Sequence, residues 1–299
     1  MSPIVLALLA VAPAQAPPPR FTVAVESVYV DVFVTDGNRP VVGLTAADFE
    51  LKDEGVRQPV ELAAVESLPL TTFLVLDTSG SVAGEKLAQL QAAARALVGG
   101  LPPADEAALV TFDEEIAVRV PPTSDRSRLE SGVRGILPGG ATALYDALYA
   151  GTLLASGRGR SLLVLFTDGE DNLSWLAAAE VKRVLLESNV LVQAVGVVPA
   201  VETDLHLDGT RRATAEPAHV QTLRRLAEVT GGRFWAADAP DRLGAAFLAI
   251  LEAMKTRYVL RFEPTRGRRE GLHRLDVRLV RGKGRVHCRK AYFVGPQSP

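Results

Sequence analysis

The sequence predicts an α/β protein: a doubly wound, mostly parallel sheet inserted into a small β-sandwich built from the two ends of the chain. In the middle of the chain, short apolar strands alternate with segments whose apolar residues recur at helical spacing. At both ends, apolar and polar residues alternate, as in antiparallel strands that have one buried and one solvent-exposed face. With 299 residues and 47% hydrophobic content, the chain can bury one large core and a smaller one.

The middle region reads as alternating strands and helices from its first apolar run to its last helix. Strands are predicted at residues 73–76, 107–112, 116–120, 161–167, 190–198 and 233–236. Helices are predicted at residues 85–98, 126–136, 143–155, 177–187, 218–229 and 239–254. The strands at 73–76 and 161–167 are apolar without alternation, which is typical of strands covered on both faces. This order predicts a doubly wound sheet.

The flanking segments each carry too few strands to fold alone, so we expect them to pair with each other. Residues 28–35 alternate and then turn at Asp36-Gly37, and residues 45–49 read as one helical turn before a short strand. Residues 258–262 and 275–279 alternate, and Gly282-Lys283-Gly284 reads as a hairpin turn before a strand over 286–293. The predicted divisions are 1–16, a signal peptide; 17–69, an N-terminal β segment; 70–256, the α/β domain; and 257–299, a C-terminal β segment that pairs with 17–69.

The first 16 residues resemble a secretory signal, which predicts a secreted or periplasmic protein. An apolar run of eight residues, 4–11, precedes the small-x-small site Ala12-Pro13-Ala14, although no Lys or Arg precedes the run. Eight residues are far fewer than the roughly 20 that span a bilayer, and we expect no transmembrane segment elsewhere. The single cysteine, Cys288, permits no internal disulfide and is expected to be a small buried hydrophobe.

Oxygen-bearing side chains follow two of the predicted strands and open a helix between them. Asp77, Ser79 and Ser81 follow the first strand, Thr142 lies in Gly-Gly-x-Thr at a helix start, and Asp168 follows the strand at 161–167. Ligands collect at the carboxyl ends of parallel strands, and hard divalent cations prefer oxygen ligands. The alternative interpretation is that these residues cap helices or shape turns.

Together these residues resemble the metal-ion-dependent adhesion site of the von Willebrand factor A domain, whose pattern is Asp-x-Ser-x-Ser, then a distant Thr, then a distant Asp. The resemblance covers residues 70–256. It implies a bound Mg²⁺, with Mn²⁺ or Ca²⁺ as substitutes, and a protein ligand whose Asp or Glu side chain completes the metal shell. More loosely, Val-x-Val-x-Val-Thr-Asp at 30–36 and Tyr-x-Leu-x-Phe-x-Pro at 258–264 resemble a group of exported bacterial A-domain proteins.

Three further carboxylates near this pattern have two interpretations each. Glu170 and Asp171 either tune the electrostatics of the site or are solvated loop residues. Asp146 lies one turn after Thr142 and either orients a ligand or is an exposed helix residue.

Enzymatic patterns are absent from the sequence. A phosphate-transferring aspartate enzyme would need a second Asp where Ser79 stands, and neither Ser79 nor Ser81 lies in a nucleophile motif. No nucleotide-binding glycine motif follows a strand. The four histidines are expected to face solvent rather than act as bases: His206, His219, His273 and His287.

Positive charge is concentrated at the C-terminal end although the net charge is only −2. Residues 257–290 hold twelve Lys or Arg against three acids. These cations could meet a polyanion, an anionic envelope or the acidic remainder of the chain, or lie on the wet face of a sheet. No aromatic residues are interleaved for base stacking, so we expect no nucleic-acid binding.

The sequence thus predicts an exported, non-enzymatic, metal-dependent adhesion or scaffold protein, with no oligomeric state specified. The alternative is an intracellular accessory factor that helps an ATPase remodel or metallate a client protein.

Overall fold

A computed structural model describes residues 27–37, 39–64, 68–198, 203–205, 211–213, 216–264 and 270–294. The predicted signal peptide, with its Ala12-Pro13-Ala14 site, and His206 lie outside these residues. Within the described part of the chain, no helix combines the length and apolar character needed to span a membrane.

The central sheet has the strand order β13-β10-β9-β6-β7-β8, and every neighbouring pair is parallel except the edge pair β7 and β8. Its strands are β6 (Leu70–Asp77), β7 (Glu106–Phe112), β8 (Ile116–Thr123), β9 (Arg160–Thr167), β10 (Val190–Val197) and β13 (Phe234–Ala237). All eight residues of β6 are buried, as expected for a strand covered on both faces. The chain leaves β6 toward β7 and later returns to its other side as β9, so the order reverses between β6 and β9.

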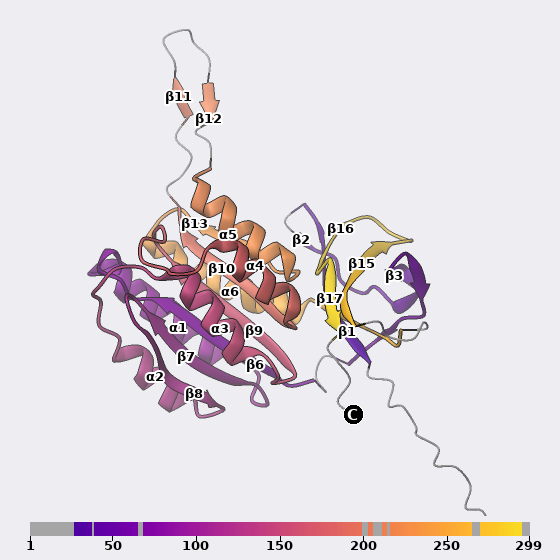
Figure 1. The fold of residues 1–299 in the computed structure, drawn as a ribbon, viewed down its shortest axis with the longest axis horizontal. Helices are drawn as coiled ribbons and strands as arrows, with labels where there is room; N and C mark the ends of the chain where they lie inside the picture. The colour runs from indigo at the N-terminus through magenta and orange to yellow at the C-terminus, as the bar shows by residue number, and fades with distance from the viewer. Residues whose placement is uncertain are drawn as a thin grey trace, which may run out of the picture.

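Helices cover both faces of this sheet, which confirms the doubly wound architecture (Figure 1). The helices are α1 (Glu85–Gly100), α2 (Arg126–Arg134), α3 (Leu144–Ala155), α4 (Ala178–Glu187), α5 (Ala218–Val229) and α6 (Leu243–Lys255). One apolar core lies under α1, α2 and α6, and a second lies under α3, α4 and α5. The helix expected over 239–254 begins only at Leu243, because Pro240–Arg242 forms a separate 3-10 turn. Another 3-10 turn, Gly80–Val82, follows β6.

A small separate ladder pairs β11 (Thr203–Leu205) with β12 (Arg211–Ala213).

The terminal segments form two antiparallel sheets, as the sequence predicts. The first has the order β16-β1-β14-β5 with β2 beside β1, and the second has the order β17-β15-β3-β4. These strands are β1 (Val28–Asp36), β2 (Arg39–Pro40), β3 (Phe49–Asp53), β4 (Val56–Gln58), β5 (Glu61–Leu62), β14 (Tyr258–Phe262), β15 (Gly271–Leu279), β16 (Arg285–Cys288) and β17 (Ala291–Val294). The helical turn expected before β3 is the 3-10 helix Ala46–Asp48. Their inward residues, among them Val32, Leu51 and Leu260, form one core, called here the sandwich core.

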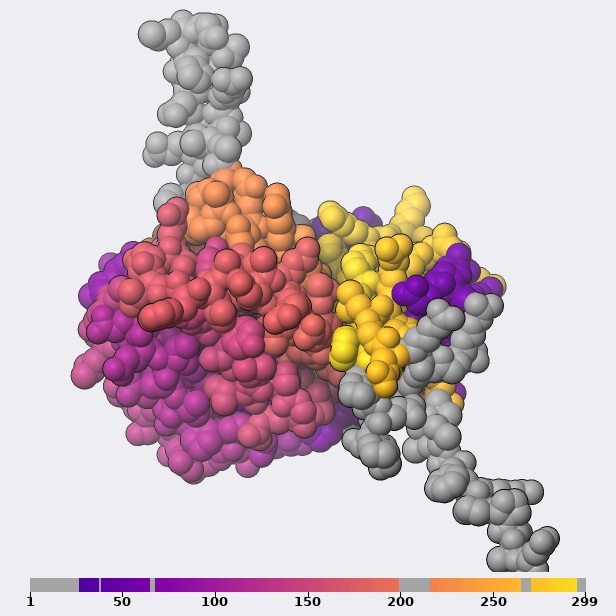
Figure 2. Space-filling model, viewed as in Figure 1, coloured from indigo at the N-terminus to yellow at the C-terminus, as the bar shows by residue number. Residues whose placement is uncertain are grey.

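Figure 2 shows the described N-terminal (indigo) and C-terminal (yellow) segments together in one lobe beside the α/β domain. We call this lobe the sandwich. The chain enters the α/β domain after β5 and returns to the sandwich with β14. The fold class is therefore confirmed, while the numbered domain divisions remain predictions.

Two sequence-based expectations for the C-terminal strands are wrong. The turn at Gly282-Lys283-Gly284 does not close a hairpin, because β15 pairs with β3 and β17 whereas β16 pairs with β1 in the other sheet. The strand expected over 286–293 is divided into β16 and β17 for the same reason, since the chain changes sheets at Arg289. Local alternation of residue types reports that a strand has two faces but does not report which sheet it joins.

His273 also departs from expectation, because it is buried within the sandwich rather than facing solvent. Its Nδ1 lies 3.2 Å from Asp53 Oδ1, and the Tyr292 hydroxyl donates to the other Asp53 oxygen at 3.2 Å. Burial is tolerated because these polar atoms satisfy one another. Cys288 is buried as expected, and burial raises its pKa to about 11.

Buried guanidinium groups join the sandwich to the α/β domain. Arg289 donates from Nη1 to Asn189 Oδ1 at 2.9 Å and from Nη2 to the Ser188 carbonyl, the C-cap of α4, at 2.5 Å. Burial lowers the pKa of Arg289 to about 10. Asp31 of β1 accepts from Arg160 at 2.5 Å and from Arg257 at 2.9 Å. The arginines expected on a wet sheet face thus include two, Arg257 and Arg289, that are buried between the domains.

Gly231, two residues beyond the end of α5, packs against the backbone of the sandwich at Cys288 and Arg289. Its φ is +88°, and a Cβ there would lie 2.4 Å from the backbone nitrogen of Arg289. Only glycine permits both the positive φ and the close approach. The packing between α5 and the sandwich therefore depends on backbone contact.

Candidate metal centre at the carboxyl edge of the sheet

The predicted site residues lie where the strand order reverses, at the carboxyl ends of β6 and β9. Leu76 of β6 is in register with Phe166 of β9, so Asp77 and Thr167 are the last residues of two adjacent parallel strands. In open α/β sheets this reversal point leaves a crevice because the connecting helices diverge to opposite faces. The fold therefore supplies a place for a ligand before any side chain is considered.

Asp77 is fully buried, at 0% exposure. Its Oδ1 accepts the backbone N–H of Ser79 at 2.9 Å, and its Oδ2 accepts the hydroxyl of Thr167 at 2.7 Å. Burial raises the pKa of Asp77, the charge of Asp168 adds to that rise, and hydrogen bonds from Ser79 and Thr167 oppose it. A buried carboxylate with dipolar partners alone favours the approach of a cation.

Hydroxyl groups connect this region to the second predicted carboxylate. Ser79 Oγ lies 3.1 Å from Ser81 Oγ, and Ser81 Oγ donates to Asp168 Oδ1 at 2.7 Å. The Asp168 side chain is 0% exposed, and Lys86 of α1 places its Nζ 2.5 Å from Oδ2. Asp168 therefore already has a cationic partner, whereas none of the described residues forms an ion pair with Asp77.

Thr142 is brought to the same edge through its loop backbone. Gly80 N–H donates to the Gly140 carbonyl at 3.1 Å, and Gly139 N–H donates to the Thr78 carbonyl at 2.8 Å. Gly140 has φ of +73°, and a Cβ there would lie 3.2 Å from Asp113 Cβ, so glycine is required for this approach. Thr142 itself is 4% exposed, and its hydroxyl makes no hydrogen bond to the other four predicted residues, all of which the structure describes.

The loop after β9 is held by carboxylates that sequence reasoning interpreted differently. Asp171 Oδ1 accepts the N–H of Leu144 at 2.9 Å, so Asp171 caps the start of α3 from a distant loop. Asp146 accepts the N–H groups of Trp175 and Leu176, each at 3.0 Å, and is neither an exposed residue nor a partner of the predicted ligands.

Glu170 is exposed and pairs with His219 Nδ1 at 2.9 Å. Lys86, which pairs with Asp168, was missed because it lies in no recognised motif. Thr167, which donates to Asp77, was expected at the end of the strand at 161–167 but was given no role in the site. The position of Thr167 at the end of an apolar strand was the one signal that could have indicated it.

Apolar side chains surround this edge on the loops that carry the predicted residues. Trp175 is 96% exposed and follows the Asp168 loop, and Leu137 is 81% exposed just before Gly139. Leu173 is 44% exposed. A fully exposed tryptophan is unusual on a monomer and is enriched at binding surfaces.

The donor set suits a hard divalent cation. Two carboxylates and three hydroxyls supply oxygen only, and Mg²⁺ accepts one or two carboxylates with retained waters in an octahedral shell. The buried, incompletely compensated Asp77 is the observation that fits a positive ion here.

Comparison with known proteins identifies the α/β domain. Residues 72–170, which include all five predicted site residues, match the family described as von Willebrand factor type A domain. The α/β domain is therefore similar to a von Willebrand factor type A domain. We call it the A domain from here on.

Individual relatives agree on the fold at low sequence identity. A UPF0353 protein from Mycolicibacterium paratuberculosis is 27% identical over 208 residues; the match covers 63% of this chain and 59% of that relative. The solved structure of a von Willebrand factor type A protein from Catenulispora acidiphila matches with a TM-score of 0.52 at 13% identity, covering 89% of this chain and 72% of that one.

A D319A mutant of the PilB minor pilin from Streptococcus sanguinis matches with a TM-score of 0.50 at 12% identity, covering 64% of this chain and 62% of that one. At these identities the likeness shows the fold alone. The likeness to the protein from Catenulispora acidiphila covers 89% of this chain and so extends beyond the A domain.

Proposed function

We propose that this protein binds a protein ligand through a divalent cation held at the carboxyl edge of the A domain, and that it carries out no catalysis. The observation that carries the proposal is the buried Asp77, linked through the hydroxyls of Ser79 and Ser81 toward Asp168. Mg²⁺ is the proposed ion, with Mn²⁺ or Ca²⁺ as substitutes, because the donors are hard oxygens.

In this proposal Asp77, Ser79, Ser81, Thr142 and Asp168 would hold the cation directly or through water. Because the three hydroxyls carry no charge, the bound ion would keep net positive charge and attract an acidic side chain of the ligand. The exposed Trp175 and Leu137 would give the ligand an apolar contact beside that carboxylate. Lys86 would compete with the ion for Asp168, since it already neutralises that carboxylate.

Calorimetric titration of Mg²⁺ tests the metal centre. Asp77→Ala should abolish binding, because the main uncompensated charge is lost, while the circular dichroism spectrum stays that of the wild type. Glu170→Gln is the matched control. It removes an exposed carboxylate from the loop that carries Asp168 without removing a proposed ligand, so the Mg²⁺ affinity should change little. Equal Mg²⁺ affinity in the wild type and Asp77→Ala would place the site elsewhere.

Pull-down with the purified protein as bait tests the ligand. Capture of a partner in Mg²⁺ that is lost on chelation, and lost with Asp77→Ala, is expected. Thr142→Ala should reduce capture more than it reduces Mg²⁺ affinity. A partner retained equally in chelator would contradict metal dependence.

We also propose that the protein is exported to the periplasm or the medium, on the strength of the apolar run and the Ala12-Pro13-Ala14 site. N-terminal sequencing of the protein from fractionated cells should find a chain that begins near Gln15. A chain that begins at Met1 or Ser2 would favour the intracellular accessory role instead.

A further inference from the structure

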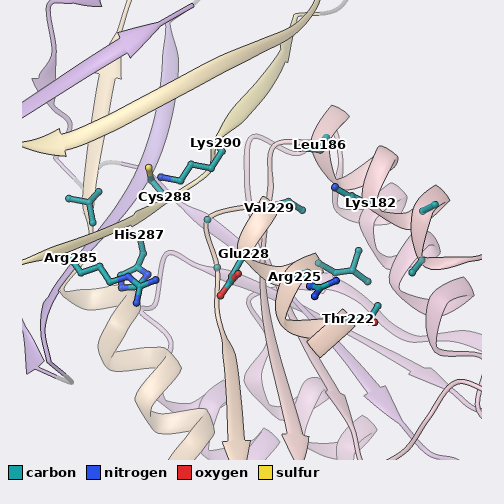
Figure 3. A pocket seen from close by; sticks show the side chains of 16 residues that line it. Lys182, Leu186, Thr222, Arg225, Glu228, Val229, Arg285, His287, Cys288 and Lys290 are labelled. Atoms are coloured by element: carbon teal, nitrogen blue, oxygen red, sulfur yellow. The ribbon is translucent and has the colours of Figure 1, made fainter. Parts of the chain in front are cut away.

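A second recess in the molecule lies between the A domain and the sandwich, away from the predicted metal centre. It has a volume of about 780 Å³ and is lined by α4, by the C-terminal half of α5 and by β16 (Figure 3). The predicted metal centre is at the carboxyl ends of the strands, whereas the sandwich packs against Arg160 at the start of β9. The two sites are therefore on opposite edges of one sheet.

Cations dominate the walls of this recess. Lys182 of α4, Arg225 of α5, Arg285 of β16 and Lys290 beyond it line the recess, and Glu228 is the single carboxylate among the lining residues. In the part of the chain that the structure describes, none of these four cations lies within ion-pair distance of a carboxylate. These four cations are exposed, and with a single carboxylate beside them they create a positive potential around the recess.

The cations come from both lobes of the molecule. In Figure 3, Arg285 and His287 lie together on the sandwich side, and Arg225 and Lys182 lie on the helices of the A domain, with Glu228 between the two groups in this view. A ligand seated in the recess would therefore be contacted from two sides. Such a placement suits an anion with more than one charged group.

His287 reports the same potential independently. It is half-buried, its Nε2 lies 3.4 Å from the hydroxyl of Thr35 on β1, and no carboxylate faces it among the described residues. Burial lowers the pKa of His287, and the charges of Arg233, Arg285 and Lys290 lower it further. Burial and nearby positive charge, including that of Arg285 and Lys290 from the recess wall, thus disfavour the protonated imidazole.

We propose that this recess binds a small, multiply charged phosphate compound that bridges the A domain and the sandwich. Its volume falls in the range of roughly 300–1,000 Å³ found for small-molecule sites. Arginine forks match phosphate oxygens in pairs, and Arg225 and Arg285 supply such forks from the two lobes. No Phe, Tyr or Trp side chain lines the recess, so a phosphate group rather than a nucleobase is the recognised feature.

Two consequences follow from the position of the recess. A bridging anion adds contacts between the lobes, so it should raise the melting temperature. It also opposes the charges that lower the pKa of His287, so binding should raise the pKa of this imidazole. Thr35, Arg233, Arg285 and Lys290 are the groups that set this response.

Calorimetry with inorganic pyrophosphate, in buffer with chelator and at fixed ionic strength, tests the proposal on the full chain. The chelator keeps the predicted metal centre empty, and Asp77→Ala should bind pyrophosphate like the wild type. We expect a Kd below about 1 mM for the wild type. Arg225→Gln/Arg285→Gln should weaken binding at least tenfold, whereas the matched pair Arg183→Gln/Arg281→Gln, exposed arginines outside the recess, should leave it unchanged.

Further arms separate the possible ligands. Glycerol phosphate and a sugar bisphosphate distinguish an organic phosphate from pyrophosphate, and tighter binding of either refines the ligand within the proposal. Equal affinity in the wild type and in Arg225→Gln/Arg285→Gln would overturn it. So would binding of a single-stranded oligonucleotide but not of pyrophosphate, because the cations would then form a nucleic-acid surface. A melting temperature that pyrophosphate does not raise in the wild type would also contradict bridging.

Discussion

The two edges of the central sheet carry opposite charge, and the molecule treats that charge differently at each. At the carboxyl edge, Asp77 is buried with hydrogen-bond donors but no ion-pair partner among the described residues. At the amino edge, the buried Arg257 is paired with Asp31, and the buried Arg289 donates to an amide oxygen and a helix carbonyl. Arg257 and Arg289 find their polar partners across the junction and so join the two lobes, whereas the charge of Asp77 has no ion-pair partner among the described residues and would accept the proposed cation.

The means of support differ as well. Loops at the carboxyl edge are held by side chains that accept backbone N–H groups, as Asp171 and Asp146 do. At the amino edge, the sandwich meets α5 by direct backbone contact at Gly231. A substitution at the Gly231 contact should therefore affect stability, and one among the predicted metal ligands should affect metal binding.

The largest effect is expected from Gly231→Ala. The new Cβ would lie 2.4 Å from Arg289 N and 2.8 Å from the Cys288 carbonyl carbon, both backbone atoms, at a φ unfavourable for alanine. We expect a loss of at least about 3 kcal/mol in the free energy of unfolding, measured by chemical denaturation. Gly244→Ala is the matched control: no atom lies within 4 Å of its added Cβ in α6, so it should be neutral or stabilise by up to about 1 kcal/mol. Equal stability of the two variants would mean that the lobes do not meet closely at Gly231.

An intermediate effect is expected from Asp31→Asn, which removes the charge shared by Arg160 and Arg257. The Arg257 side chain is only 5% exposed, so its charge would remain buried without a counter-ion. The free energy of unfolding should fall by about 2 to 3 kcal/mol, less than for a fully buried pair because Asp31 retains 22% exposure. Asp276→Asn, an exposed carboxylate on β15 without an ion pair among the described residues, should change it by no more than about 0.5 kcal/mol. If both substitutions have the same effect, the junction does not depend on compensated charge.

The smallest effect is expected from the pH dependence of stability at His287. Because the pKa of folded His287 lies below its ordinary value of 6.5, the unfolded chain binds more protons in the window just below that value. Stability should therefore decline as the pH falls from 7 toward 5, and His287→Gln should reduce that decline. Thermal melts of wild type and variant across this range provide the measurement. Parallel curves would show that the amino edge does not disfavour the protonated imidazole.

Much of the fold could be predicted because its signals are local. The unbroken apolar strands that became β6 and β9, and the helical spacing that became α1 and α5, are written in consecutive residues. The positions of Asp77 and Asp168 follow directly, since each stands at a strand end. Cys288 was predicted to be buried from its residue type alone, since a free cysteine usually behaves as a small hydrophobe.

The remainder depends on pairs of residues far apart in the chain. Asp171 caps α3, whose first residue, Leu144, precedes it by 27 positions, and local capping rules address only adjacent residues. The sheet change at Arg289 depends on which strands β1 and β15 pair with. Lys86 comes to Asp168 from α1 and belongs to no motif in the sequence. Sequence patterns locate the apolar faces of helices and strands and the ends of strands. They do not show which distant residues come into contact when the chain folds.

The insertion of the A domain has a mechanical consequence. The chain crosses between the lobes twice, from β5 to β6 and from α6 to β14, and the second crossing leaves only Thr256 and Arg257 between the two elements. Asp31, which is paired with Arg160 and Arg257, lies beside both crossings. A tensile force applied between the carboxyl edge and the sandwich would be divided over two covalent paths in parallel, which leave the sandwich from the paired strands β5 and β14. Under tension the two lobes, joined by two linkers, would move together more than two domains joined by a single linker would.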